Sequence, residues 1–362
     1  MNLKETPLIN MHEELGASLG NFAGWKMPID YGDPLREALN TRKEAAVFDI
    51  SHLSRILIEG ESAERFLQEL IAKDIRKGKI GSIIGPTAFL NKEAGFKDDV
   101  LVYKLNEGSF LIVGNAINRN KILNWLMENA NYKELTDLKI KDLTLETAML
   151  ALQGPKSSHI MRVLNINLEN IPFFNFVKEI DTYVGKIGLI SVSGWTGERG
   201  YELIGDPTIL SKLFKEFIDR GANPAGLGAR DILRVEMGFC LYGHEIDENV
   251  NPVEAKYWVF SWEKRGYVGE KALRKILSSG VRRVRVGIIL RPRSPLPRQG
   301  SKIYVGDAEV GVVTSSTYSP ILDRPLAIGY VNSRYSIIGF RVYVETRYKK
   351  VVGKIVEPPF VK

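Results

Sequence analysis

This chain of 362 residues has one cysteine, no long apolar run and no segment that resembles a secretory signal. Each absence excludes a class of structure or a location. The one cysteine, Cys240, cannot form an internal disulfide, which fits a reducing compartment. No apolar run approaches the roughly 18 residues of a membrane-spanning helix, so we expect no membrane association. The polar stretch MNLKETPLINMHEELG lacks the apolar core of a secretory signal, and we therefore predict a cytoplasmic protein.

Histidine is scarce as well, and the common catalytic motifs are missing. No P-loop and no G-x-S-x-G turn occurs, and the glycines of residues 194–200 and 226–231 do not complete a dinucleotide fingerprint. The net charge of +7 is modest and the basic residues are scattered, so we expect no nucleic-acid surface. The histidines lack the spacing of zinc ligands, and we predict no metal site from His12, His52, His159 and His244.

The order of helical and extended patterns predicts an α+β fold. Helical patterns cover residues 34–47, 61–71, 119–130, 207–221 and 229–243. The extended runs 85–92 and 98–105, joined by a Glu-Ala-Gly turn, predict a hairpin. Short strands without helices follow residue 280 and predict a small β-barrel. We therefore divide the chain into residues 1–280, with two interleaved α+β domains that meet near 50–145, and a barrel domain over 281–362.

The chemistry that remains available is that of carboxylates and arginines beside glycine-rich turns. In NKEAGFKDDVLVYKL, Asp98 and Asp99 begin an apolar strand, and alternation lets only one of them face a given side. A strand-end carboxylate is usually solvated, and an arginine near an acid is usually a structural ion pair. Spacing alone therefore leaves both readings open for the other candidates, which are Glu198, Glu202, Arg230, Asp231 and Arg234.

Eight motifs together carry a resemblance that covers almost the whole chain. They are NFAGWKMPIDY, VFDISHLSR, AGFKDDVLVYKL, ALQGPKS, SGWTGERGYEL, PAGLGARDILRVEMGFCLYGHEIDENVNPVEA, YVGEKAL and VTSSTYSPIL. In this order they resemble the glycine cleavage system T proteins, the tetrahydrofolate-dependent aminomethyltransferases. The resemblance implies a three-domain cloverleaf around a central folate channel, with a C-terminal β-barrel.

The resemblance also implies a reaction. The methylene of an aminomethyl group on the lipoylated H protein passes to tetrahydrofolate, ammonia is released, and dihydrolipoyl H protein remains. Loss of the thiolate from S–CH2–NH2 leaves an iminium cation, which a fixed carboxylate beside that carbon would stabilise. The implied partners are the lipoylated H protein and tetrahydrofolate, and no metal is required.

By resemblance, the catalytic carboxylate is the second of the pair, Asp99. Strand parity then puts Leu101 and Tyr103 on its face, whereas Asp98 points away, to a turn amide or an arginine. Glu202 would accept the adjacent N–H donors of the pterin edge, and Arg230 would hold the catalytic carboxylate or the folate. The other implied folate-binding positions are Asn115, Trp195, Phe239, Phe174 and Lys362.

Several positions depart from the family pattern. Lys97 lies beside the acids, Pro86 and Trp195 stand where tyrosine is usual, and Val192 stands where arginine is usual. Aromaticity is kept at Trp195, so a flat ligand can still stack there. These departures leave two alternatives open. One is another folate-dependent one-carbon enzyme, such as a demethylase, and the other is a non-catalytic folate-binding protein of the same fold.

Overall fold

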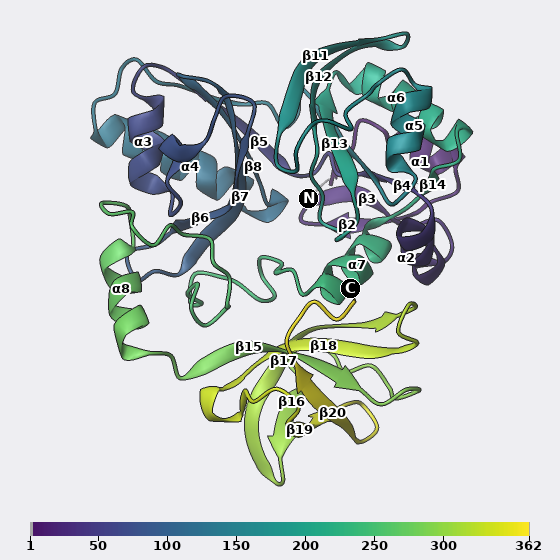
Figure 1. Ribbon diagram of the computed structural model, residues 1–362, viewed down its shortest axis with the longest axis vertical. Coiled ribbons are helices and arrows are strands. Elements are labelled where there is room, and N and C mark those ends of the chain that lie inside the picture. The colour runs from purple at the N-terminus through teal and green to yellow at the C-terminus, as the bar shows by residue number, and fades with distance from the viewer. Residues whose placement is uncertain (1–2, 362) are drawn as a thin grey trace.

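The computed structural model describes residues 3–361, which form three lobes around a common centre (Figure 1). Two α+β lobes lie beside each other, and a closed β-barrel lies below them in this view. The expected α+β class, three-lobed arrangement and C-terminal barrel are confirmed. Lys362, one of the implied folate-binding positions, lies outside the described residues.

The first lobe is a five-stranded sheet with the strand order β6–β7–β8–β5–β9. Helices α3 (Ala63–Leu70) and α4 (Arg119–Tyr132) pack on one face, where their apolar side chains share a buried cluster with the strands. The antiparallel pairing of β6 with β7 confirms the expected hairpin. The strands are β5 (Ser54–Glu59), β6 (Ile83–Leu90), β7 (Phe96–Asn106), β8 (Ser109–Gly114) and β9 (Lys139–Asp142).

The second lobe is a six-stranded sheet with the order β11–β12–β13–β10–β4–β14, flanked by the small sheet β1–β3–β2. The strands of the larger sheet are β4 (Ala46–Asp49), β10 (Ala148–Gln153), β11 (Phe176–Thr182), β12 (Gly185–Ser191), β13 (Gly200–Gly205) and β14 (Asn223–Pro224). Those of the smaller sheet are β1 (Lys4–Glu5), β2 (Ser18–Phe22) and β3 (Trp25–Asp30). The helices of this lobe are α1 (Ile9–Glu14), α2 (Pro34–Lys43), α5 (Ser157–Val163), α6 (Pro207–Asp219) and α7 (Leu227–Met237).

Two predicted helices are shorter in the structure than in the sequence pattern. The helix predicted over 34–47 ends at Lys43, because Ala46–Asp49 form strand β4 between β10 and β14. Sheet pairing therefore overrides the local helical pattern. The helix predicted over 229–243 ends at Met237, because Gly238 adopts a left-handed φ of 70° and terminates α7. Cys240, which falls within the helix predicted over 229–243, is buried in the loop after α7.

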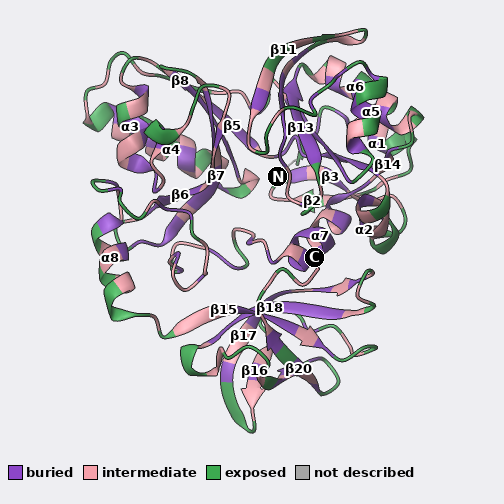
Figure 2. Cartoon of the chain, in the orientation of Figure 1, coloured by how far each residue is buried: buried purple, intermediate pink, exposed green. Residues whose placement is uncertain are grey.

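The third lobe is a closed barrel with the strand order β15–β18–β17–β16–β19–β20. Its strands are β15 (Arg283–Leu290), β16 (Lys302–Val305), β17 (Ala308–Ser319), β18 (Arg324–Asn332), β19 (Arg341–Glu345) and β20 (Lys350–Val356). Helix α8 (Glu270–Ser279) leads from the first lobe into the barrel (Figure 1). Buried residues concentrate in the strands of each lobe (Figure 2). None of the helices within residues 3–361 is both long enough and apolar enough to cross a membrane.

Candidate active site

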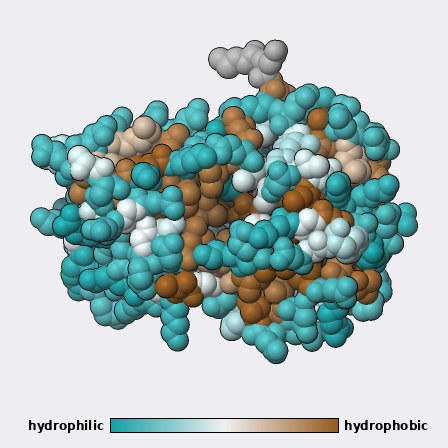
Figure 3. All heavy atoms as spheres, turned by 90° about the horizontal axis from the view of Figure 1, so that it is seen from above, coloured by the Kyte–Doolittle hydropathy of each residue, from teal (hydrophilic) through white to brown (hydrophobic). Residues whose placement is uncertain are grey.

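A cavity of about 330 Å³ lies between the two α+β lobes. The ends of β7 and β8 form one wall, the turn at Gly194 and Trp195 forms another, and α7 with the loop after it forms a third. Apolar side chains supply much of the lining, including Phe22, Leu53, Pro86, Leu101, Val113 and Leu227. Seen from above, hydrophobic residues gather around a hollow at the centre of the molecule (Figure 3). A largely apolar cavity with a few polar groups is the usual form of a small-molecule site.

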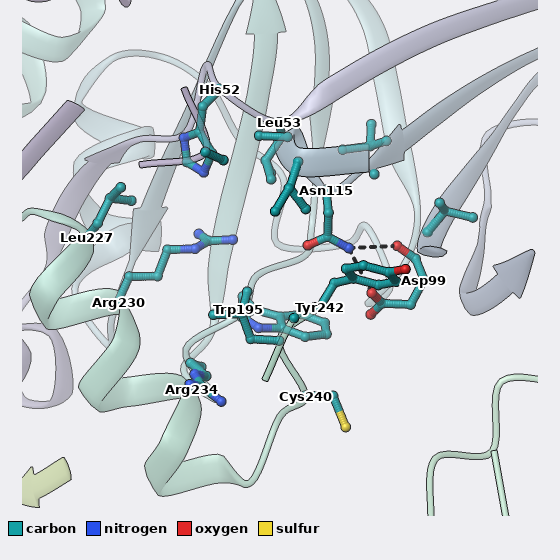
Figure 4. A pocket seen from close by; sticks show the side chains of 18 of the residues that line it. His52, Leu53, Asp99, Asn115, Trp195, Leu227, Arg230, Arg234, Cys240 and Tyr242 are labelled. Carbon is teal, nitrogen blue, oxygen red and sulfur yellow. Dashed lines mark hydrogen bonds between the residues drawn. The ribbon is translucent and has the colours of Figure 1, made fainter. Parts of the chain in front are cut away.

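Asp99 brings a carboxyl group into this cavity from strand β7. Its Oδ1 accepts a hydrogen bond of 2.8 Å from Asn115 Nδ2 (Figure 4). Its Oδ2 accepts one of 3.0 Å from the hydroxyl of Tyr257. Burial raises the pKa of Asp99 to about 6, against the opposing effect of these two donors. The carboxyl group therefore titrates close to neutral pH, where an acid or a base is most useful.

Asp98 lies behind Asp99 and does not border the cavity in the described structure. It accepts hydrogen bonds from Asn115 Nδ2 at 2.8 Å, from Asn118 Nδ2 at 2.6 Å and from the Asn115 backbone N–H at 3.2 Å. The structure thus provides the turn amide anticipated for Asp98 and no arginine partner among these bonds. Burial, and then the charge of Asp99, raise the pKa of Asp98 to about 8.

Glu202 and Arg230 face the cavity from β13 and α7. Ser193 Oγ donates a hydrogen bond of 2.6 Å to Glu202 Oε2. Burial raises the pKa of Glu202, and the nearby charge of Arg230 opposes this shift. Burial lowers the pKa of Arg230, and its buried Nη1 has no hydrogen-bond partner in the described structure. Arg230 therefore acts on the charge of Glu202, whereas Asp99 is held by Asn115 and Tyr257.

The predicted aromatic positions divide into one that reaches the cavity and two that lie behind it. Trp195 lines the cavity, and the Phe239 ring packs against it with centroids 4.9 Å apart. Phe174 stacks on Phe173 at 4.4 Å. Neither Phe239 nor Phe174 is among the described residues that border the cavity. Figure 4 shows Arg230 and Asp99 on opposite sides of this space, with Trp195 between them in this view.

Besides His244, which also lines the cavity, sequence reasoning missed three polar residues at the site. His52 lines the cavity, and its buried Nδ1 has no partner within residues 3–361. Burial and the charge of Arg230 lower the pKa of His52 to about 3, so the ring is neutral. Tyr242 lines the cavity, and Tyr257 bonds Asp99. His52 and Tyr242 stand within the quoted motifs, which was the available signal, whereas Tyr257 lies just beyond the longest motif.

The departures from the family pattern fall in different places. Pro86 and Trp195 both line the cavity, so they shape the space for a ligand. Lys97 points to helix α4, where its Nζ lies 5.4 Å from the ring centroid of Trp125. Val192 is buried in the apolar core of the second lobe. Two of the four departures therefore affect the cavity directly.

The fold and this site define a class: a three-lobed protein with a central ligand cavity, which has an acid on one side and an arginine and a glutamate on the other. Comparison with known proteins makes that class specific. A family model described as the GCVT N-terminal domain matches residues 8–264, and one described as the glycine cleavage T-protein C-terminal barrel domain matches residues 283–362.

Similar proteins match along their whole length. A probable aminomethyltransferase of Aeropyrum pernix is 38% identical, with 100% of this chain and 98% of the relative covered. An aminomethyltransferase of Halothermothrix orenii is 37% identical, with 99% and 100% covered. The crystal structure of glycine cleavage system aminomethyltransferase T from Bartonella henselae superposes with a TM-score of 0.91 at 33% identity, over 99% and 98% of the two chains. The chain belongs to the glycine cleavage T-protein family of aminomethyltransferases.

Proposed function

We propose that this protein is the aminomethyltransferase of a glycine cleavage system. It takes the methylene of the aminomethyl group carried by lipoylated H protein, passes it to tetrahydrofolate, and releases ammonia and dihydrolipoyl H protein. The observation that carries the proposal is the cavity carboxyl of Asp99, fixed by Asn115 and Tyr257 in a chain related to aminomethyltransferases over its full length. A fixed acid of this kind suits a reaction that develops positive charge on carbon.

Asp99 has two tasks in this proposal. When the thiolate leaves S–CH2–NH2, the ionised carboxylate stabilises the iminium carbon without reorganisation, because two donors already orient it. With a pKa of about 6, the same group can then hold and return a proton as ammonia leaves. The donors from Asn115 and Tyr257 favour the ionised form, which is the form that the first task needs.

Glu202 and Arg230 supply the recognition of the reduced pterin. A carboxylate accepts the adjacent N–H donors of the pterin edge in bidentate fashion, and Glu202 lines the cavity with such a group. The unpartnered Nη1 of Arg230 supports a ligand at this end, because buried donors are normally satisfied. Trp195 offers a flat apolar surface for stacking, backed by the Phe239 ring. Phe174 would act through the packing of the second lobe.

The position of the cavity in the chain also supports a division into domains. We propose residues 1–280 as the folate-binding region and residues 281–362 as the barrel domain, since every residue that lines the cavity precedes residue 281. The proposed protein partner is the lipoylated H protein, which carries the aminomethyl group. The cytoplasmic location stays a prediction from the sequence, to be checked by cell fractionation.

Reconstitution tests the proposal directly. Purified protein is mixed with aminomethyl-loaded H protein and tetrahydrofolate, and methylene-tetrahydrofolate and ammonia are measured against the uncatalysed rate. Equal amounts of the two products above that rate are expected. No product above background would refute the proposal. One-carbon transfer from a free methylated amine without H protein would instead favour the demethylase alternative, and folate binding without turnover on any donor would favour the non-catalytic one.

A further inference from the structure

Asp98 is a buried acid that the proposed chemistry does not use. Its exposed fraction is 1%, compared with 9% for Asp99, and it does not border the cavity in the described structure. Its hydrogen-bond partners are all neutral amide groups, from Asn115 and Asn118. A substrate in the cavity therefore meets Asp99 and not Asp98. The question is why a second carboxyl group is kept in a buried position beside the first.

Asn115 links the two acids. Its Nδ2 lies 2.8 Å from Asp98 Oδ1 and 2.8 Å from Asp99 Oδ1. An amide nitrogen has two hydrogens, so it can donate one to each carboxyl group. The reversed amide would place its oxygen against both acids, which fixes the orientation of the side chain. Asp98 therefore acts with Asp99 to fix which end of Asn115 faces Asp99.

Asp98 is itself held in place from two sides. Asn118, which is 3% exposed, donates a 2.6 Å hydrogen bond to Asp98 Oδ1. Gly114 leaves room on the other side, because a Cβ at this position would lie 2.8 Å from Asp98 Oδ2. Asn118 directly precedes helix α4, and in the described structure its side chain accepts no capping hydrogen bond from that helix. The Asn118 amide is thus committed to Asp98 and not to the end of the helix that it precedes.

We propose that Asp98 and Asn118 are positioning residues for the transfer reaction. Together they hold the Asn115 amide so that one of its N–H groups always faces the Asp99 carboxylate. The inference rests on the proposed role of Asp99. Neither residue touches the substrate. Their contribution is to keep Asp99 in one orientation and to keep a donor beside it that favours its ionised form.

The inference also predicts how the activity depends on pH. The hydrogen bond that Asn115 donates to Asp99 sets the direction of the effect. The Asn115 bond lowers the pKa of Asp99 against burial, which leaves it at about 6. If Asn115 turns away, the ionised form loses a donor and the pKa of Asp99 rises. The titratable groups whose charges act with this pair are Tyr242, which faces Asp98, and Tyr257 and Cys240, which face Asp99. The pKa of each of these three is itself raised by burial, so they stay neutral at the pH of interest.

The test uses Asp98→Ala and Asn118→Ala in the full chain, with Asn129→Ala as the matched control. Asn129 donates an amide hydrogen bond within helix α4 and has no link to the acid pair. For the two test variants we expect kcat to fall about tenfold, with the KM for tetrahydrofolate within about twofold of the parent. We also expect the acid limb of kcat, near pH 6 in the parent, to move up by about one pH unit. The control should keep both values.

The conservative variant separates positioning from a direct role. Asp98→Asn keeps a neutral oxygen acceptor for Asn115 and Asn118, so it should recover most of the activity lost in Asp98→Ala. Wild-type kcat and an unmoved acid limb in Asp98→Ala would overturn the inference. A loss in Asp98→Asn as deep as that in Asp99→Asn would also overturn it, because Asp98 would then act on the reacting atoms.

A second measurement does not depend on turnover. Protein labelled with carboxyl-13C aspartate is titrated by difference infrared spectroscopy, and the Asp99 band is assigned by its loss in Asp99→Asn. In Asp98→Ala and Asn118→Ala this band should titrate at higher pH than in the parent. That shift, in a protein that transfers no methylene, would show that Asp98 and Asn118 position Asp99 and would refute the proposed function. If the parent protein is active but the band does not shift in either variant, the inference alone is refuted.

Discussion

Helix α7 carries two arginines one turn apart, Arg230 and Arg234, and they differ in their hydrogen-bond partners. Arg234 donates to Glu245 at 2.7 Å, to Asp231 at 2.8 Å and to Ser315 of the barrel at 2.8 Å. Arg230 has no ion pair and keeps a buried Nη1 without a partner in the described structure. Buried donors are normally satisfied within the protein. The first arginine therefore holds lobes together, and the second is available to a ligand.

Arg234 also lines the cavity, but the other charged and polar groups there differ in the same way from those of the junction beneath the cavity. At the junction, Glu245 also accepts from Thr314, and Arg42 joins Glu198 to Glu236, so each charge has a partner of opposite sign. In the cavity, burial shifts the pKa of Asp99, Glu202 and His52 toward the neutral form. Perturbed titrating groups that gather in a cavity mark a functional site, whereas paired charges mark an interface.

The largest expected effect is on the cavity side. Asp99→Asn keeps the size of the side chain but removes the charge that stabilises the iminium carbon, so kcat should fall on the order of 10²- to 10³-fold. Tetrahydrofolate affinity, measured by fluorescence titration, should change little, because Glu202 and Arg230 remain. Asp98→Asn is the matched control. Turnover close to that of the parent in Asp99→Asn would remove the acid from the mechanism.

A substitution at the junction should instead lower the stability of the protein. Arg234→Met leaves Glu245 as an uncompensated buried charge, which costs about 3–5 kcal/mol of unfolding free energy. Urea unfolding followed by tryptophan fluorescence measures this loss. Adding Glu245→Gln to Arg234→Met should recover part of it, since the unpaired charge is gone. An Arg234→Met variant as stable as the parent would show that the ion pair does not hold the junction.

Arg230→Met should have the opposite effect: it should weaken tetrahydrofolate binding and leave stability nearly unchanged. Within the described residues its buried Nη1 has no hydrogen bond to lose, so the unfolding free energy should change by less than about 1 kcal/mol. Tetrahydrofolate affinity should fall about 10- to 100-fold, as expected when a charged hydrogen bond worth about 1.5–3 kcal/mol is removed. A variant that loses stability and keeps its folate affinity would erase the distinction between the two arginines.

Much of the fold was predictable from local pattern. The hairpin of β6 and β7 and the barrel after residue 280 follow from alternation and turn residues that act over short distances. Helix α2 ended early because β4 pairs with β10, a contact about 100 residues away in sequence that no local pattern reports. Helix α7 ended at Gly238, whose left-handed conformation the longer helical pattern concealed.

The site was predictable only as a set of candidates. The stretch ARDILR shows two arginines with equal local signals, and their different roles depend on Glu245 and Ser315, which the fold brings to one of them only. Tyr257 reaches Asp99 across 158 positions of sequence. Asn118 directly precedes helix α4, yet its amide binds Asp98 and not the helix end. These outcomes depend on which side chains meet in three dimensions, and a single sequence does not contain that information.

The smallest expected effect concerns Lys97, which belongs to neither side of the comparison. It precedes the acid pair, but its ammonium lies over the Trp125 ring, and its charge acts on the pKa of Glu248. Lys97→Met keeps the apolar stem and removes the charge, so it should cost about 0.5 kcal/mol of stability and leave kcat within about twofold. If Lys97 did stabilise the ionised acid, its loss would raise the pKa of Asp99 and move the acid limb of kcat above pH 6. An unmoved limb is the expected result, because the Lys97 ammonium lies over Trp125 of α4 whereas the Asp99 carboxyl group borders the cavity.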